Sequence, residues 1–173
     1  TADEANIALR KMEETWQFYM NGHIQFPEPF CDSDKKYKIQ IFISNAYGLN
    51  GSGVAPNIGA MWINTGAIKS EHYGGFRHEF NHTLQMTTAG MRTSEYSGWV
   101  WESMAEFFRF QHPEEQEHAG CTAFHAWAPH VYFGSTRNRY CNWQFWEHIK
   151  DEYGFQAIHD IWLKTAFIDG QDP

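Results

Sequence analysis

The sequence has no excess of positive charge and no long apolar run. The chain has 13 Lys and Arg residues and 21 Asp and Glu residues, which gives a net charge of −8 with neutral histidines. A nucleic-acid-binding surface needs a basic face, so this balance argues against nucleic acid as a partner. No apolar stretch approaches the roughly 20 residues of a transmembrane helix, so no membrane span is expected. The chain also shows no internal repeat and no low-complexity segment.

Cysteine is scarce, with three residues in the chain. An odd number does not define a pairing pattern by itself. Cys121 and Cys141 flank a loop-rich stretch and are the candidate disulfide, and three buried thiols are the alternative. The chain begins at Thr1 without Met and shows no signal peptide. We therefore expect a processed, secreted or extracytoplasmic protein, with a recombinant fragment as the alternative.

Aromatic residues and histidine are abundant instead. The 173 residues include 14 Phe, 8 Tyr, 8 Trp and 10 His. Such aromatic side chains both fill cores and line clefts. The length suits a single domain, 1–173, that can bury a core. We expect the N-terminal helix and the sheet within about 1–90, and a mostly helical part within about 91–173. The oligomeric state does not follow from the sequence.

Hydrophobic periodicity predicts a helix, then strands, then more helices. Apolar residues recur at helical spacing over 3–20 and alternate with polar residues over 37–44, which predicts a helix and a strand. We predict a flexible loop over 48–59 and a second strand over 60–68. The remaining predictions are a helix that follows Gly74 and Gly75 and ends near Gly90, helices over about 98–111, 138–152 and 155–166, and irregular structure over 113–137. This order predicts an α+β fold.

The most informative motif is 76-FRHEFNHTLQ-85. His78 and His82 are four residues apart on a predicted helix, so both side chains lie on one face. Glu79 is next to His78 and can reach a water on an ion that both imidazoles hold. In the H-E-x-x-H pattern, the imidazoles bind Zn²⁺ and the carboxylate takes a proton from the bound water. The alternative is that the pattern arose by chance, because ten histidines in one chain make a short histidine motif more frequent.

A catalytic zinc ion needs a third protein ligand. The metzincin pattern would place a third histidine six residues after His82, where the chain has Thr88. Glu102, on the next predicted helix, is therefore the candidate third ligand for one Zn²⁺ per chain. Glu106 lies one turn further on the same face and is expected to orient a ligating imidazole. A solvated acidic face is the alternative, but most neighbouring residues are apolar and carboxylates among them need partners.

H-E-x-x-H at 78–82 followed by E-x-x-x-E at 102–106 resembles the gluzincin metallopeptidases, such as thermolysin-like proteases and the membrane-type aminopeptidases. The resemblance implies a zincin fold, with a small twisted sheet over an active-site helix and a mostly helical C-terminal part. It also implies that a water activated by Glu79 hydrolyses peptide bonds in peptide or protein substrates. From about 37 to 163, the chain is also similar to secreted bacterial and fungal domains, including the Svx/AvrXca avirulence proteins.

The chain departs from the gluzincin pattern in the segments expected to hold substrate and to stabilise the oxyanion. The edge-strand Asn-Ala pair that holds substrate in thermolysin-like enzymes has its nearest counterpart at Asn64. A tetrahedral oxyanion also needs a hydrogen-bond donor. In the aminopeptidases a tyrosine with the pattern Tyr-x-x-Gly opens a downstream helix, and 140–154 is similar except that Trp143 replaces the glycine. We predict Tyr140 as the catalytic donor, with His130 as the second candidate and a core or rim aromatic as the alternative for Tyr140.

Two other functions remain open. The protein could be a secreted binding or elicitor module that keeps zinc only for stability. Glu79 argues against that function, because a structural zinc site needs no base and usually has four protein ligands. The protein could also act on glycoproteins or bind carbohydrate, which would require four tryptophans to be exposed in the cleft. These are Trp62, Trp99, Trp101 and Trp127.

Overall fold

The computed structural model describes most of the chain and shows an α+β fold, as predicted. The residues that it does not describe are 22–23, 30–33, 36, 47, 56–57, 71–73, 89–90, 92–97, 116–118, 136 and 166–173. The strands in the described part are β1 (Gln40–Ile43), β2 (Asn50–Ala55) and β3 (Ile58–Ile63). The helices there are α1 (Ala2–Met20), α2 (Thr65–Lys69), α3 (Gly74–Thr87), α4 (Gly98–Phe110), α5 (Ala119–Trp127), α6 (Trp143–Tyr153) and α7 (Phe155–Lys164).

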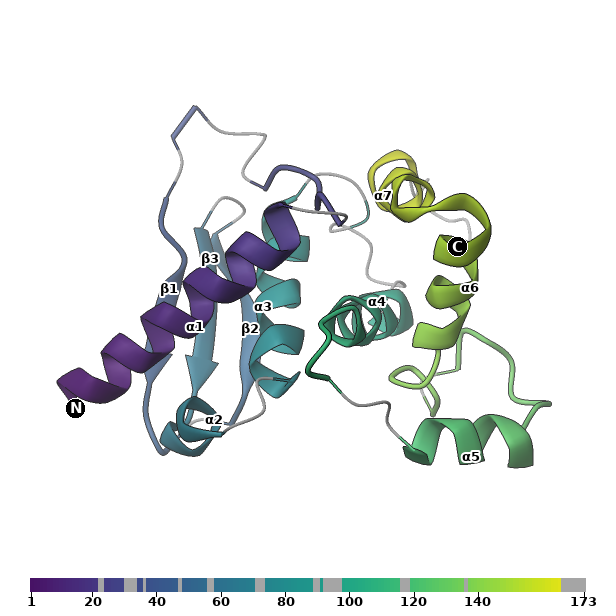
Figure 1. Cartoon of the computed structure of the whole chain (residues 1–173), viewed down its shortest axis with the longest axis horizontal. Helices are drawn as coiled ribbons and strands as arrows, with labels where there is room; N and C mark the ends of the chain where they lie inside the picture. Colours follow the sequence, from purple (N-terminus) through teal and green to yellow (C-terminus); the bar gives the residue numbers. More distant parts are fainter. Residues whose placement is uncertain are drawn as a thin grey trace.

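The strands form one small mixed sheet in the order β1-β3-β2. β1 runs parallel to β3, with Gln40 opposite Ala60, and β2 runs antiparallel to β3, with Asn50 opposite Trp62. Helix α3 packs on β2 and β3, and α4 packs on α3. Helix α6 packs on α4, and α7 packs on α6 and lies above it in Figure 1. The helix with the H-E-x-x-H motif therefore lies between the sheet and the C-terminal helices.

Helix α1 matches the helix predicted over 3–20. It begins with a capping box, in which the Thr1 side chain accepts from the backbone N–H of Glu4 and the Glu4 side chain reaches back to Thr1. Near its end, the hydroxyl of buried Tyr19 accepts a hydrogen bond of 2.7 Å from Nδ2 of Asn81 on α3. This contact fixes the N-terminal helix against the helix that carries the motif.

The prediction of a flexible loop over 48–59 is wrong, because β2 and the start of β3 lie there. The glycines of this segment allow close contact between the sheet and α3. A Cβ added at Gly51 would lie 1.7 Å from the carbonyl oxygen of Glu79, and one added at Gly59 would lie 2.4 Å from the Thr83 side chain. Glycine within a strand often marks such a close approach, so the pattern carried a signal that the prediction missed.

Three other predicted elements differ from the structure. The strand predicted over 60–68 ends earlier, because the Asn64 side chain accepts a hydrogen bond of 2.8 Å from the backbone N–H of Ala67 and caps α2. Asn64 thus follows the central strand and does not lie on the sheet edge. The stretch 113–137 contains helix α5, and the helix predicted over 138–152 begins only at α6, after a hydrogen-bonded turn.

The core lies on both sides of α3, where eleven of the fourteen residues are buried. On the sheet side, Phe80 meets Trp16 and Tyr19 of α1 at ring-centroid distances of 6.4 and 6.2 Å. On the other side, large buried side chains of α4, α6 and α7 pack together, among them Phe107 and Trp146. Because α3 is so deeply buried, its polar side chains need partners inside the protein. No helix in the described part of the chain is both long and apolar enough to cross a membrane.

Candidate metal centre and its cleft

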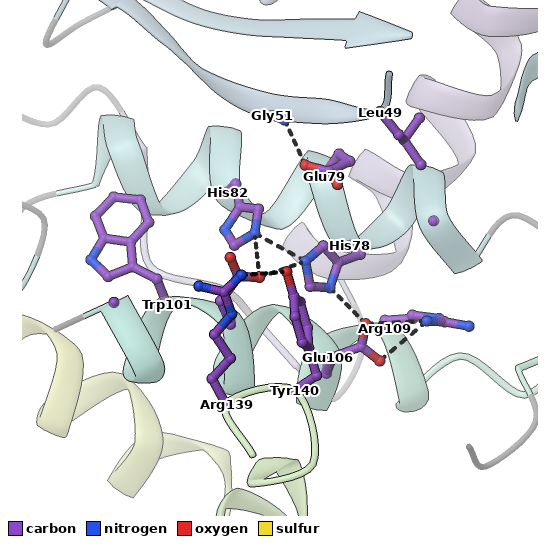
Figure 2. A pocket seen from close by; sticks show the side chains of 13 residues that line it. Leu49, Gly51, His78, Glu79, His82, Trp101, Glu106, Arg109, Arg139 and Tyr140 are labelled. Atoms are coloured by element: carbon purple, nitrogen blue, oxygen red, sulfur yellow. Dashed lines mark hydrogen bonds and ion pairs between the residues drawn. The ribbon is translucent and has the colours of Figure 1, made fainter. Parts of the chain in front are cut away.

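Helices α3 and α4 bring three candidate ligand atoms together at a cavity of about 520 Å³ (Figure 2). His78 and His82 lie one turn apart on α3, with 3.0 Å between their Nε2 atoms. Glu102 lies in the first half of α4. Its Oε2 is 3.1 Å from Nε2 of His78 and 3.3 Å from Nε2 of His82. The three atoms therefore form a nearly equilateral triangle.

The triangle has dimensions close to those of a zinc site. Tetrahedral ligands about 2.0–2.2 Å from Zn²⁺ lie roughly 3.3–3.6 Å from one another. The observed separations of 3.0 to 3.3 Å need only a small outward movement of the side chains. Two imidazole nitrogens and a carboxylate oxygen are also a typical catalytic zinc ligand set. The three side chains thus fit a zinc ion, and they are the candidate ligands among the described residues.

The surroundings of the imidazoles support the same assignment. Nδ1 of His78 lies 2.8 Å from Oε1 of Glu106, and Nδ1 of His82 lies 2.8 Å from Oε1 of Gln85. Both neighbours present acceptor oxygens, so imidazoles that bound a metal ion through Nε2 would direct their Nδ1 protons to these oxygens. Both Nε2 atoms and the Glu102 carboxylate oxygen face one small space. Such a group of atoms attracts a cation, either a proton or a metal ion.

The electrostatics of the cluster favour a positive charge at this position. Burial lowers the pKa of His78, but its contacts with Glu102 and Glu106 outweigh burial and raise the pKa to about 9. Burial raises the pKa of Glu102, yet the hydrogen bonds with His78 and His82 prevail and lower it. The pKa of Glu106 is also lowered, against burial, by His78 and Arg109. Both carboxylates are therefore ionised at neutral pH, and a metal ion could replace the proton that they favour.

A chain of alternating charges leads from His78 into the protein. Glu106 accepts hydrogen bonds of 3.2 and 3.1 Å from Nη1 of Arg109. Nε of Arg109 donates to Glu115 at 3.2 Å, and Glu115 also forms an ion pair with buried Arg77. These contacts hold the Glu106 carboxylate in place beside the imidazole. Sequence reasoning identified Glu106 but missed Arg109, although a spacing of three residues on a helix is typical of an ion pair.

Gln85 holds His82 in a comparable way. Its Nε2 donates to the carbonyl oxygen of Trp101 at 3.1 Å, which fixes the amide so that Oε1 faces His82. The Trp101 ring lies near the His82 ring, with 6.3 Å between centroids, and lines the cavity. Gln85 was not predicted, and its position three residues after His82 on the same helix face is the signal that pointed to it.

Glu79 lies on the side of the cavity that faces the sheet (Figure 2). Its Oε2 accepts a hydrogen bond of 2.6 Å from the backbone N–H of Gly51 on β2. This bond holds the carboxylate next to the triangle and leaves lone pairs on its other oxygen for a proton. Gly51 was missed in the sequence because its segment was predicted to be a loop.

Tyr140 and Arg139 reach the cavity from the turn before α6 (Figure 2). The Tyr140 ring lies 5.9 Å from the His78 ring between centroids, and its hydroxyl accepts a hydrogen bond of 3.2 Å from Nη2 of Arg139. The Arg139 guanidinium also lies over the Tyr140 ring, 4.9 Å from its centroid. Burial and then the charge of Glu102 raise the pKa of Tyr140. The phenol therefore keeps its proton at neutral pH and can donate a hydrogen bond.

Two buried asparagines and a disulfide hold this turn in place. Nδ2 of Asn138 donates to Oδ1 of Asn142 at 2.9 Å, and Nδ2 of Asn142 donates to the carbonyl oxygen of Phe133. Cys121 and Cys141 form a disulfide that links the turn to α5. The residue that presents the phenol is thus adjacent to a covalent cross-link.

Other residues that the sequence suggested lie outside the cavity lining. His130 is exposed and does not line the cavity, so Tyr140 is the one of the two candidate donors that reaches it. Among the four tryptophans that carbohydrate binding would need in the cleft, all of them described, Trp101 alone lines the cavity. Trp127 is 87 % exposed, but it is not part of the lining.

Comparison with known proteins assigns the chain to a family. The family model "Family of unknown function (DUF6055)" matches residues 2–173. Because the match covers almost the whole chain, the protein belongs to this family. No curated protein and no solved structure gives a significant match to the chain. The family's description names no activity, so the function has to be argued from the site.

Proposed function

We propose that this member of a family of unknown function is a zinc-dependent hydrolase of peptide bonds, of the gluzincin type. One observation carries the proposal. The Nε2 atoms of His78 and His82 and Oε2 of Glu102 lie within 3.3 Å of one another, with the Glu79 carboxylate lining the same cavity. Three ligands rather than four, among the described residues, favour a catalytic ion over a structural one.

The residues of the chain have distinct tasks in this proposal. When bound, Zn²⁺ supplies Lewis-acid polarisation of the substrate carbonyl and lowers the pKa of a water molecule. The free oxygen of Glu79 accepts a proton from the attacking water, while Gly51 holds the other oxygen. Glu79 then delivers that proton to the leaving amine. The Tyr140 hydroxyl donates to the carbonyl oxygen as negative charge develops there.

The arrangement of the elements supports a zincin-type fold. The helix with both histidines lies against a small sheet, and the following helix contributes Glu102. The strand nearest Glu79 is β2, an antiparallel edge strand. The disulfide between Cys121 and Cys141 supports a secreted or extracytoplasmic location, since disulfides persist in oxidising compartments. The proposed substrates are peptides or proteins, glycoproteins included.

Zinc content tests the site directly. We expect one zinc ion per chain after loading and dialysis, measured by mass spectrometry of the metal. His78→Ala, His82→Ala and Glu102→Ala should each lose zinc at modest chelator concentrations, because each removes one of three ligands. Glu152→Gln, on an exposed position of α6, should keep it. Stoichiometric zinc in Glu102→Ala would mean that another residue is the third ligand.

Glu79→Gln tests the chemistry separately from the metal. The amide cannot accept a proton from water, so hydrolysis should fall by roughly 10²–10⁴-fold while zinc is retained. The assay is digestion of a broad set of peptides and glycoproteins, with products identified by mass spectrometry and Glu152→Gln as the matched control. Activity of Glu79→Gln near the wild-type level would reject the mechanism. A zinc-loaded wild type that cleaves nothing in the set would favour a binding module.

A further inference from the structure

We propose that Arg139 binds a carboxylate of the substrate, so that the cleft selects peptides with a carboxylate close to the scissile bond. This inference rests on the proposed function, because it assigns a substrate class to the same cleft. An acidic side chain and a free C-terminus present the same planar pair of oxygens. Both sources therefore fit the proposal, and the experiment below distinguishes them.

The two described arginines of the cavity lining differ in their partners. Arg109 is neutralised by Glu106 and Glu115, with hydrogen bonds between 3.1 and 3.2 Å. Arg139 instead contacts the uncharged Tyr140, through the 4.9 Å ring contact and the 3.2 Å hydrogen bond. Within the described part of the chain, no carboxylate forms an ion pair with Arg139. Of its five N–H donors, one is used by the phenol among the described residues.

The carboxylates of the cleft already have other partners. Glu102 belongs to the triangle with both imidazoles, Glu106 is held by Arg109, and Glu79 accepts from the backbone of β2. A chain with a net charge of −8 offers many acids to an arginine, yet none of the described ones pairs with Arg139. The positive charge of Arg139 is therefore available to an anion that enters the cavity.

The guanidinium is also held in position before any ligand arrives. It stacks on the Tyr140 ring, and the turn that carries it is fixed by the Cys121–Cys141 disulfide and by the buried side chains of Asn138 and Asn142. A planar guanidinium can donate two parallel hydrogen bonds to a carboxylate, and little freedom is lost when it is already oriented.

The position of Arg139 relative to the metal centre limits where the carboxylate lies on the substrate. Arg139 donates a hydrogen bond to the Tyr140 hydroxyl, and the centroid of the Tyr140 ring is 5.9 Å from that of the His78 ring. An extended peptide covers about 3.3–3.6 Å per residue, so the bound carboxylate belongs to a residue roughly one or two positions from the scissile bond.

Binding is the first test, because it does not depend on turnover. Zinc-loaded Glu79→Gln protein is titrated calorimetrically with acetyl-Ala-Phe-Glu amide, acetyl-Ala-Phe-Gln amide and acetyl-Ala-Phe-Gln with a free C-terminus. A carboxylate held by two charge-assisted hydrogen bonds should tighten binding by roughly 10–100-fold over the doubly neutral peptide. Preference for the first peptide identifies a side-chain carboxylate, and preference for the third identifies the C-terminal one.

Substitutions in the same background isolate Arg139. Arg139→Met should bring the ratio between acidic and neutral peptides close to one, and Arg139→Lys should leave an intermediate ratio because it keeps the charge without the planar fork. Arg137→Met removes an exposed arginine from the same turn, outside the cavity lining, and should preserve the ratio. Comparing ratios cancels any direct attraction between the carboxylate and the metal ion, which is present in every variant.

The outcomes separate this inference from the proposed function. Equal binding of acidic and neutral peptides, no measurable binding of any of them, or an acid preference that survives Arg139→Met would overturn the role of Arg139. An Arg139-dependent preference in binding, with no cleavage of any peptide by the zinc-loaded wild type, would uphold this role and reject hydrolysis. Cleavage with equal kcat/KM for acidic and neutral peptides would support hydrolysis and reject the role of Arg139.

Discussion

Replacing Gly51 with alanine should force the sheet away from the helix that carries the candidate site. The added Cβ would lie 1.7 Å from the carbonyl oxygen of Glu79 and 2.5 Å from its carbonyl carbon, whereas real Cβ contacts are essentially never under 3.0 Å. Both are backbone atoms, so no side-chain rotation relieves the overlap. Strand β2 must shift, and the 2.6 Å hydrogen bond from Gly51 to the Glu79 carboxylate must lengthen or break.

The expected loss of stability combines two effects. Overpacking of a close contact costs about 1–3 kcal/mol, and loss of a hydrogen bond to a charged group costs about 1.5–3 kcal/mol. Together they lower the free energy of unfolding by about 2.5–6 kcal/mol. For a domain of this size, 1 kcal/mol corresponds to about 2–4 °C, so Tm should fall by about 5–24 °C.

Gly48→Ala is the matched control for this experiment. It makes the same chemical change three residues earlier, where an added Cβ meets nothing within 4 Å. Thermal and urea unfolding of both variants, followed by circular dichroism, measure the difference, and zinc content is recorded alongside. Equal unfolding midpoints for the two variants would refute the close approach between β2 and α3.

Three further predictions concern single side chains. Glu106→Gln should weaken zinc binding by roughly 10–100-fold, because the 2.8 Å contact with Nδ1 of His78 loses its charge; competition with a fluorescent chelator measures this, and an unchanged affinity would contradict it. Tyr140→Phe should lower kcat by about 10²–10³-fold with KM and zinc content nearly unchanged, since the hydroxyl acts on charge that develops in the transition state. A silent substitution in steady-state kinetics would show that Tyr140 only packs. Burial lowers the pKa of His159 from 6.5 to about 4. The folded state thus disfavours the proton, so the contribution of His159 to stability is fully present above pH 6.5 and should fall by up to about 3 kcal/mol as pH drops towards 4. In urea unfolding at several pH values, His159→Leu should show a weaker dependence of the unfolding free energy on pH than the wild type. The same pH dependence in both proteins would contradict this role of His159.

Local periodicity predicted the longer helices and strand β1, but missed β2 and the short helices α2 and α5. The helix predicted over 98–111 is observed at Gly98–Phe110, because its apolar spacing and the following Pro113 are local signals. Strand β2 was missed because glycine lowers strand propensity. Glycine is needed at position 51 because the strand contacts Glu79 of α3, which is 28 residues away along the chain. Short-range sequence patterns contain no information about such a contact.

In the candidate site too, local sequence signals identified some residues, while others depend on contacts between distant parts of the chain. His78 and His82 share one helix face, so spacing alone was enough to place their side chains together. Glu102 could be proposed only because a zinc ion needs a third ligand, and the packing of α4 on α3 brings it there. Gly51 and Arg139 were missed, since each reaches the cleft from a strand or turn whose position depends on the whole fold.

The hydrogen bonds and the disulfide that shape the turn carrying Arg139 and Tyr140 join residues within 121–142. The wall opposite Glu79 is thus braced separately from α3, which supplies the two imidazoles and Glu79. As a consequence, this wall can vary in sequence while α3 and α4 keep the candidate ligands in place. Under the function proposed above, exchanging Arg139 would alter what the cleft admits, provided that Tyr140 on the same wall is kept. Members of the family could therefore differ in the ligand that the cleft accepts while sharing the candidate metal site.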